Sequence, residues 1–243
     1  MQTRRLTSYV TQLTRLASMN CYFVQEDDGL TLVDTNLPGS KSLILGAAKH
    51  ARGPICRILL THAHIDHIGS LDALHAARPE AEVIISVREA RLLKKDCSLD
   101  PGEPQSKPRG SFPGAKTNPT RLLNEGDYVG HLRAISTPGH TPGHFSFLDE
   151  RDGTLLGGDG LIGFGGLRVA GDAPWYFALA NAATWDAHTA LESARKLLAL
   201  NLEGLATGHG PAIIGPPTQA ALAKAVAHAE ASFSRLTGAV ARS

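Results

Sequence analysis

Short apolar runs and amphipathic stretches alternate along most of this chain of 243 residues. Runs of four to eight apolar or β-branched residues bounded by Gly, Pro or Asp predict strands, and apolar residues spaced by three and four predict helices. The expected strands are two within 21–39, around an Asp-Asp-Gly turn, and one in each of 55–60, 82–87, 120–124, 131–137, 144–150, 154–158 and 204–208. The expected helices are 40–51, 70–79, 88–96, 184–200 and 217–236.

The order of these elements predicts the fold class. Strands and helices alternate at both ends of the chain and strands follow one another in the middle, which indicates a mixed α/β architecture with helices outside the sheet. Ser40 is a possible helix N-cap. One face of the helix in 184–200 carries the apolar residues Ala187, Leu191, Ala194 and Leu198.

Residues 97–119 break the pattern. They are rich in Pro, Gly and Ser and contain few apolar residues, so we expect an irregular loop. A loop of this length can form a lid over a site; the alternative is an insertion without function.

Composition narrows the class of partner. The net charge is +1 and no long basic block occurs, which argues against nucleic acid. The apolar runs are too short to span a bilayer, so no membrane partner is expected. The first 20 residues lack acidic side chains, as transit peptides do, but they run directly into a strand-like segment. The three cysteines, Cys21, Cys56 and Cys97, are widely spaced and odd in number, which favours a reducing, cytoplasmic environment.

The strongest chemical signal is residues 61–69, "THAHIDHIG", which follow the apolar run in 55–60. Imidazoles without partners at the end of a buried strand would cost several kcal/mol, roughly, in desolvation, and a metal ion would compensate for that cost. His62 and His64 lie two residues apart, so on an extended segment they point the same way and can share one ion. Asp66 and His67 follow in a turn and can face a second ion. Imidazole and carboxylate ligands without thiolate suit Zn²⁺, and also Fe or Mn.

Three further stretches place a His or Asp beside glycines after an apolar strand. They are "AISTPGHTPGH", "TLLGGDG" and "GLATGHG", and they supply His140, Asp159 and His209. Taken alone, each is an ordinary turn. Together with the histidine cluster they could complete two metal sites, because one carboxylate can bridge two ions roughly 3.5–4 Å apart.

These motifs, in this order, resemble those of the metallo-β-lactamase fold superfamily, and the likeness covers nearly the whole chain. "NCYFVQEDDGLTLVDTNLPG" resembles the opening strands of that family and places Asp34 in its usual aspartate position. The resemblance implies one domain over residues 1–243 and a four-layer αβ/βα sandwich with the metals at one edge, between two sheets.

The resemblance also implies the role of each candidate residue. It assigns His62, His64 and His140 to the first metal, Asp66, His67 and His209 to the second, and Asp159 to both. It places His144 on the following strand, near the site but not as a ligand. The other histidines are expected to be structural or exposed: His50, His75, His131, His188 and His228.

The implied activity is metal-dependent hydrolysis of an ester, thioester or lactone of a small molecule. Two divalent ions, Zn²⁺ or else Fe or Mn, would hold a bridging hydroxide that attacks the carbonyl, and Asp66 would orient it. No G-x-S-x-G nucleophile motif is present. The sequence leaves open two alternatives, a mononuclear-iron persulfide dioxygenase and a non-catalytic metal-binding protein, as well as the oligomeric state.

Missing features narrow the subfamily. No cysteine lies near Asp159, unlike in the thiolate-ligand β-lactamases, and only about one helix follows the last histidine motif, unlike in type II glyoxalases. Ile162 stands where quorum-quenching lactonases typically have tyrosine. The likeness is therefore to compact bacterial hydrolases of the fold.

Four aromatic residues after Asp159 bear on the substrate. Phe164, Trp175, Tyr176 and Phe177 could form the wall of a pocket together with loop 97–119, or could simply fill the core. The first alternative predicts a small to medium, partly apolar substrate.

Overall fold

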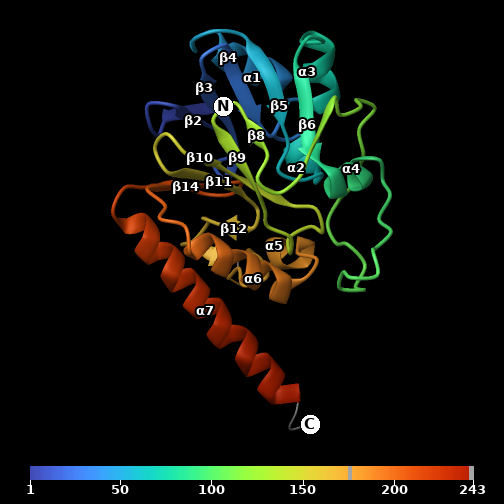
Figure 1. Ribbon diagram of the computed structural model, residues 1–243, viewed down its shortest axis with the longest axis vertical. Helices are drawn as coiled ribbons and strands as arrows, with labels where there is room; N and C mark the ends of the chain where they lie inside the picture. Colours follow the sequence, from blue (N-terminus) through green and yellow to red (C-terminus); the bar gives the residue numbers. More distant parts are fainter. Residues whose placement is uncertain (175–176, 241–243) are drawn as a thin grey trace.

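The computed structural model describes residues 1–174 and 177–240, except for the side chains of residues 179 and 236–240. A seven-stranded sheet forms the first half of the molecule (Figure 1). Its strands, in spatial order, are β1 (Gln2–Arg5), β2 (Val10–Arg15), β3 (Met19–Glu26), β4 (Gly29–Val33), β5 (Ile55–Leu59), β6 (Glu82–Ser86) and β7 (Arg121–Leu123). Strands β1 to β4 pair antiparallel, and β4 to β7 pair parallel.

A six-stranded sheet forms the second half. In spatial order it contains β15 (Ile213–Ile214), β14 (Gly204–Thr207), β11 (Thr154–Gly158), β10 (Phe145–Asp149), β9 (Leu132–Ser136) and β8 (Tyr128–Val129). Within it, β11 and β14 pair parallel and the other neighbours pair antiparallel. A separate small ribbon joins β12 (Leu161–Ile162) to β13 (Arg168–Val169).

The helices are α1 (Lys41–Ala48), α2 (Ile65–Ile68), α3 (Leu71–Ala77), α4 (Val87–Leu93), α5 (Ala178–Ala183), α6 (Ala187–Leu198) and α7 (Pro217–Val240). Helices α1, α3 and α4 cover the outer face of the first sheet, and α6 and α7 cover that of the second. In Figure 1, α1 and α3 lie at the top, α6 and α7 lie at the bottom, and the sheets lie between them.

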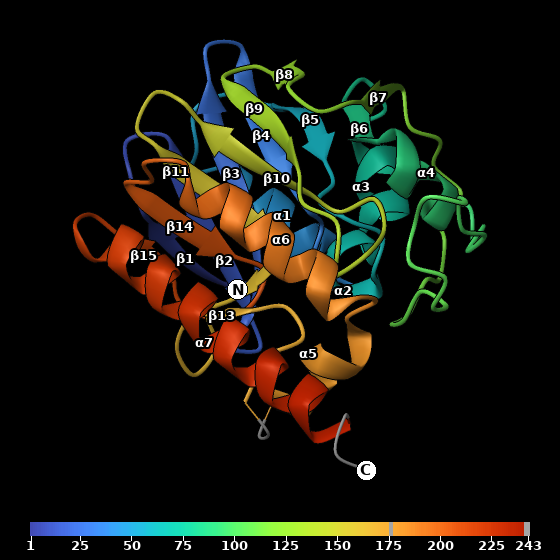
Figure 2. The same cartoon turned by 60° about the horizontal axis from the view of Figure 1, so that its bottom comes forward.

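Three apolar clusters hold these layers together. The first joins the seven-stranded sheet to α1, α3 and α4 and includes Leu74. The second lies between the two sheets and brings Leu59 against Phe147 and its neighbours. The third packs α6 and α7, through Leu191 and Leu222, on the six-stranded sheet (Figure 2). The layers therefore run helix, sheet, sheet, helix, which confirms the predicted αβ/βα sandwich.

Burial on both faces explains why the end of β5 is so apolar, although Cys56 and Arg57 earlier in the strand are only partly buried. Ile58 belongs to the cluster beneath the helices and Leu59 to the cluster between the sheets. Successive side chains of a strand point to opposite faces, so a strand with both faces buried is a continuous apolar run. The chain emerges from this rigid strand directly into the histidine cluster.

The predicted elements match the observed ones closely, with three corrections. Ser40 stands at the N-cap position of α1 but does not cap it: its backbone is helical and its hydroxyl accepts a hydrogen bond from Arg15 Nη1 (2.8 Å). The buried face of α6 is centred on Ala190, Leu191 and Ala194, whereas the predicted Ala187 and Leu198 are only partly buried. The sequence did not predict β1 and β2, which form the edge of the first sheet within the first 20 residues, nor the short elements β8, β12, β13, β15, α2 and α5.

Within the described part of the chain, none of the helices combines the length and the apolar character that crossing a membrane requires.

Candidate metal centre

The ligand candidates converge at one edge of the sandwich because each follows the end of a strand or lies in a strand connection. His62 comes after β5, Asp159 after β11, and His209 after β14. His140 lies in the turn between β9 and β10. The two sheets therefore contribute to one place, as the sequence predicted.

The first group consists of His62, His64 and His140. Their ring nitrogens face one another: His62 Nε2 lies 3.2 Å from His64 Nδ1, which lies 3.0 Å from His140 Nε2. All three side chains are buried, and the three atoms are close enough to hold one metal ion. Three imidazoles and no thiolate form a donor set that suits Zn²⁺ or Fe.

The second group consists of Asp66, His67, Asp159 and His209. His209 Nε2 lies 3.1 Å from Asp66 Oδ2 and 3.1 Å from Asp159 Oδ2. His67 Nε2 lies 3.3 Å from Asp159 Oδ1. Asp66 and His67 are neighbours on the single helical turn α2, and His67 Nε2 lies 3.9 Å from Asp66 Oδ2.

Asp159 links the two groups. Its Oδ2 lies 3.1 Å from His209 Nε2 in the second group and 3.6 Å from His140 Nε2 in the first. Its Oδ1 is buried and forms no well-aligned hydrogen bond with the described residues, although His67 Nε2 lies 3.3 Å away. A buried carboxylate oxygen without a hydrogen bond is costly unless something occupies it, and a metal ion fits both its charge and its surroundings.

The glycine before His209 leaves room for this arrangement. A Cβ atom at Gly208 would lie 2.0 Å from Asp159 Oδ1 and 2.7 Å from His67 Cε1. The "GHG" motif thus supplies space for the neighbouring donors as well as a donor of its own.

The two groups differ in their electrostatics. Burial, together with the neighbouring imidazoles, holds the pKa values of His62 and His140 well below the usual range, so their rings are neutral. Burial also lowers the pKa of His209, but the Asp159 and Asp66 carboxylates outweigh it and raise this pKa to about 9. The first group therefore presents free lone pairs, whereas a metal ion entering the second group displaces protons.

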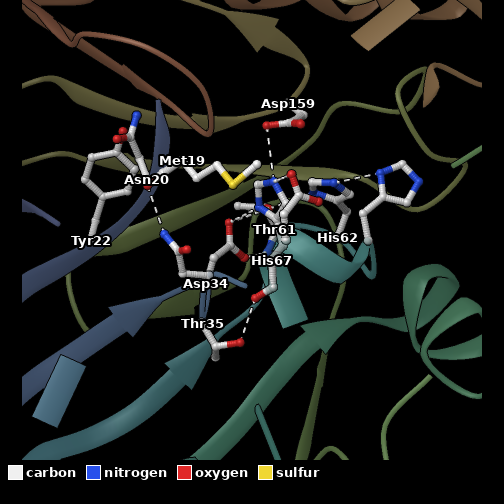
Figure 3. A network of polar contacts seen from close by, with 12 residues as sticks. Met19, Asn20, Tyr22, Asp34, Thr35, Thr61, His62, His67 and Asp159 are labelled. Carbon is white, nitrogen blue, oxygen red and sulfur yellow. Dashed lines mark hydrogen bonds and ion pairs between the residues drawn. The ribbon is translucent and has the colours of Figure 1, made fainter. Parts of the chain in front are cut away.

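Asp34 orients one of the candidate ligands, as the network in Figure 3 shows. Its Oδ2 lies 2.7 Å from His67 Nδ1, and its two oxygens accept hydrogen bonds from the backbone and the hydroxyl of Thr61 (2.9 and 2.8 Å). The contact leaves His67 Nε2 free to face the second group. Asp34 also has a left-handed backbone (φ 61°), a strained conformation of the kind that clusters at functional sites.

His144 is buried beside the site and is not part of either donor group, as expected. Its Nδ1 donates to Thr137 Oγ1 (2.8 Å), and its Nε2 accepts from the backbone N–H groups of Asp159 and Gly160 (3.1 and 3.2 Å). Burial lowers the pKa of His144 to about 3, so the ring stays neutral and can keep accepting both bonds. It fixes the backbone that carries Asp159.

Glu89 on α4 is a residue near the site that the sequence did not single out. Its carboxylate is completely buried and accepts hydrogen bonds from the Ala63 and Gly143 backbones and from the Thr141 hydroxyl. Burial raises the pKa of Glu89 to about 7, although these three bonds favour the ionised form. Its position on an ordinary helix gives no sequence signal, because only the fold brings it to the ligand loops.

Loop 97–119 lies against the first group. The Arg109 carbonyl lies 2.9 Å from His64 Nε2, so it fixes that nitrogen as the protonated one and leaves Nδ1 for the metal. The ring centroids of Phe112 and His64 lie 4.7 Å apart. The Ser106 carbonyl oxygen accepts a hydrogen bond from Trp185 Nε1 (2.6 Å).

The aromatic residues after Asp159 lie partly at the site. The ring centroid of Phe177 lies 5.6 Å from that of His209 and 5.0 Å from that of Phe164. Trp175 and Tyr176, which the sequence also placed in a pocket wall, lie outside the described residues.

Comparison with known proteins agrees with this geometry. Residues 16–209 match the sequence profile of the metallo-beta-lactamase superfamily. The chain is 45% identical to the uncharacterized protein YobT of Bacillus subtilis (strain 168), over 87% of this chain and 94% of that one. It is 31% identical to the probable metallo-hydrolase YflN of the same organism, over 81% of this chain and 82% of that one.

A solved structure shares the fold. The crystal structure of TTHA1623 in a di-iron-bound form superposes with a TM-score of 0.59 at 25% identity, covering 83% of this chain and 92% of that one. The profile match spans most of the chain, both donor groups are in place, and the relatives include a probable metallo-hydrolase. The chain belongs to the metallo-β-lactamase superfamily, as a metal-dependent hydrolase.

Proposed function

We propose that this hydrolase cleaves an ester, thioester or lactone of a small molecule with the help of two divalent metal ions. The observation that carries the proposal is the pair of adjacent donor groups joined by Asp159. Its Oδ1 lies near His67 of the second group, and its Oδ2 lies between His209 of the second group and His140 of the first. One shared carboxylate is the ligand that holds two ions at the separation a two-metal hydrolase requires.

Bound metal ions would polarise the substrate carbonyl and lower the pKa of water to near neutrality. The first ion would be held by His62, His64 and His140, and the second by Asp66, His67 and His209, with Asp159 reaching both. Zn²⁺ is our choice for both, and the di-iron form of a related structure keeps Fe as an alternative.

Asp66 could contribute to the reaction in addition to binding metal. Its side chain is 20% exposed, whereas those of His67, His209 and Asp159 are 8% exposed or less. A carboxylate at the open side of the site can accept a hydrogen bond from the attacking water and orient it toward the substrate. We assign that role to Asp66.

Loop 97–119 would act as the lid within a single domain. It contacts the first group through Arg109 and Phe112, and it is tied to the start of α6 through Trp185. A loop in this place limits the access of water and the size of the substrate. Phe112 and Phe177 present rings at opposite donor groups, which favours a substrate that is partly apolar.

The experiment uses protein prepared without added metal and three probe substrates: p-nitrophenyl acetate, S-phenyl thioacetate and γ-butyrolactone. We expect hydrolysis of at least one, loss of it after chelation, and recovery when Zn²⁺ is returned. Oxygen consumption with glutathione persulfide and no hydrolysis of any probe would instead show the mononuclear-iron dioxygenase. Metal binding without either activity would show a binding protein.

A further inference from the structure

Glu89 occupies a position that hydrophobic packing alone does not explain. It lies in the first turn of α4, where the N-cap Ser86 accepts a hydrogen bond from the Glu89 N–H (3.0 Å), and its side chain turns inward, with no exposed surface. No cationic side chain of the described residues lies within ion-pair distance of its carboxylate; the adjacent Arg88 pairs with Glu103 (2.6 Å). Burying an ion without a counter-ion is expensive, so its hydrogen bonds must compensate.

Those hydrogen bonds reach the two loops that carry the first donor group. Oε1 accepts from the Ala63 N–H (2.8 Å), and Ala63 lies between His62 and His64. Oε2 accepts from the Thr141 hydroxyl (2.8 Å), and Thr141 directly follows His140. One side chain thus fixes the backbone beside all three histidines.

A third bond and a close contact tighten the same link. Oε2 also accepts from the Gly143 N–H (3.0 Å). A Cβ atom at Gly143 would lie 2.3 Å from the Glu89 backbone nitrogen, so the histidine loop packs directly against α4. The N-cap Ser86 donates its hydroxyl to the Gly143 carbonyl (2.6 Å), which adds a second connection between the helix and the loop.

We propose that Glu89 is a positioning residue for the first metal site, because its carboxylate spans the "HAH" and "GHT" loops and sets the spacing of His62, His64 and His140. The inference rests on the metal sites of the proposed function. Three donors converge on two oxygens, and only an ionised carboxylate can accept from all of them without presenting a donor of its own.

The second site has its own carboxylate, which makes the proposal specific. Asp34 contacts His67 and Thr61, and it contacts none of the three backbone or hydroxyl groups that Glu89 binds. Loss of Glu89 should therefore weaken the first site and spare the second. Loss of Asp34 should weaken the second site most, because Asp34 reaches the first only through Thr61, whose hydroxyl lies 3.0 Å from His62 Nδ1.

The experiment measures Co²⁺ affinity for one site at a time at pH 8. His209→Ala protein reports the first site and His140→Ala protein reports the second. In Glu89→Gln the amide must place its NH₂ group against at least one N–H donor. We expect Co²⁺ to bind the first site about 10- to 100-fold more weakly and the second within about threefold of the parent, since removing a hydrogen-bonded partner of metal ligands typically has that effect. Asp34→Asn should weaken the second site more than the first.

Glu26 offers a matched control. Its carboxylate is also buried, but it binds His131 Nδ1 (2.6 Å) and lies near Arg151 (3.7 Å), neither of which contacts a ligand loop. Glu26→Gln should lower the stability of the metal-free protein and leave both Co²⁺ affinities within about threefold. Equal weakening of both sites by Glu89→Gln, or no weakening, would overturn the proposal.

A milder variant covers the case in which Glu89→Gln does not fold. Thr141→Val removes only the hydroxyl that donates to Oε2, and it should weaken the first site about fivefold, the effect of one hydrogen bond. Unchanged affinity in that variant would also overturn the proposal. Because the readout is metal affinity, a failure of the hydrolase function would show separately, as a protein with this selectivity but no hydrolysis of any probe.

Discussion

Substitution of Gly208 by alanine is a sharp test of how tightly the second donor group is built. The added Cβ atom would lie 2.0 Å from Asp159 Oδ1 and 2.7 Å from His67 Cε1. Non-bonded atoms prefer roughly 3.5 Å or more, so Asp159 must retreat by about 1 Å or more. Both side chains are buried among the other candidate ligands, which leaves them little room to move without breaking the donor geometry.

The size of the effect follows from that displacement. A misplacement of about 1 Å at a reacting site typically costs about 100-fold in rate, and inserting a methyl group into a packed interior costs about 1–3 kcal/mol of stability. We therefore expect Gly208→Ala to retain about one metal ion per chain and to hydrolyse ester about 100-fold more slowly.

The assay compares metal content, ester hydrolysis and urea unfolding of Gly208→Ala and a control. The control is Gly46→Ala in α1, where an added Cβ atom meets nothing within 4 Å. It should keep both metals and full activity, and gain up to about 1 kcal/mol from helix propensity. If Gly208→Ala bound two metals and hydrolysed ester within about twofold of the parent, the derived packing of Asp159 would be wrong.

Three further substitutions extend the test. His62→Ala should abolish hydrolysis and leave a folded protein whose metal-free form loses about 2–4 kcal/mol to the cavity; an unfolded variant would show that the site is structural. Asp159→Asn, which offers one oxygen and no charge, should lower metal occupancy of the second group most and reduce hydrolysis by several orders of magnitude, and full activity with one metal would contradict a two-metal mechanism. The pKa of His144 is about 3 in the folded protein, below its value of about 6.5 in the unfolded chain. Because the unfolded chain alone takes up this proton, the contribution of His144 to the free energy of unfolding is lost as the pH falls below 6.5. Metal-free protein should lose about 2 kcal/mol through this residue between pH 6.5 and pH 4.5, and His144→Gln, measured by urea unfolding at both values, should lack that part of the slope; an unchanged slope would mean that the ring is protonated in the fold.

The donor residues could be predicted from sequence because their chemistry is local. Three imidazoles and a carboxylate within six positions have few explanations other than metal, and the apolar strand before them fixes where the cluster emerges. The motifs that supply His140, Asp159 and His209 could be interpreted as metal ligands only because this cluster is present. The structure brings all seven candidate ligands into two groups.

The groups that orient those donors could not be predicted in the same way. Glu89 belongs to an ordinary amphipathic helix, and the Arg109 partner of His64 is a backbone carbonyl, which any residue type provides. Their roles arise from contacts between segments far apart in the chain, and neither spacing nor residue type records such contacts. The prediction that Ser40 caps α1 was wrong for a related reason, because the Ser40 hydroxyl contacts Arg15 on β2, a residue far from it in the sequence.

The central claim is that two metal ions act together at Asp159. It is tested most directly by titrating chelator-treated protein with Zn²⁺ and following ester hydrolysis at each addition. The account predicts saturation at two equivalents per chain, with most of the activity appearing during the second equivalent. Full hydrolysis after a single equivalent, or a protein with two bound ions that hydrolyses no ester, thioester or lactone, would contradict it.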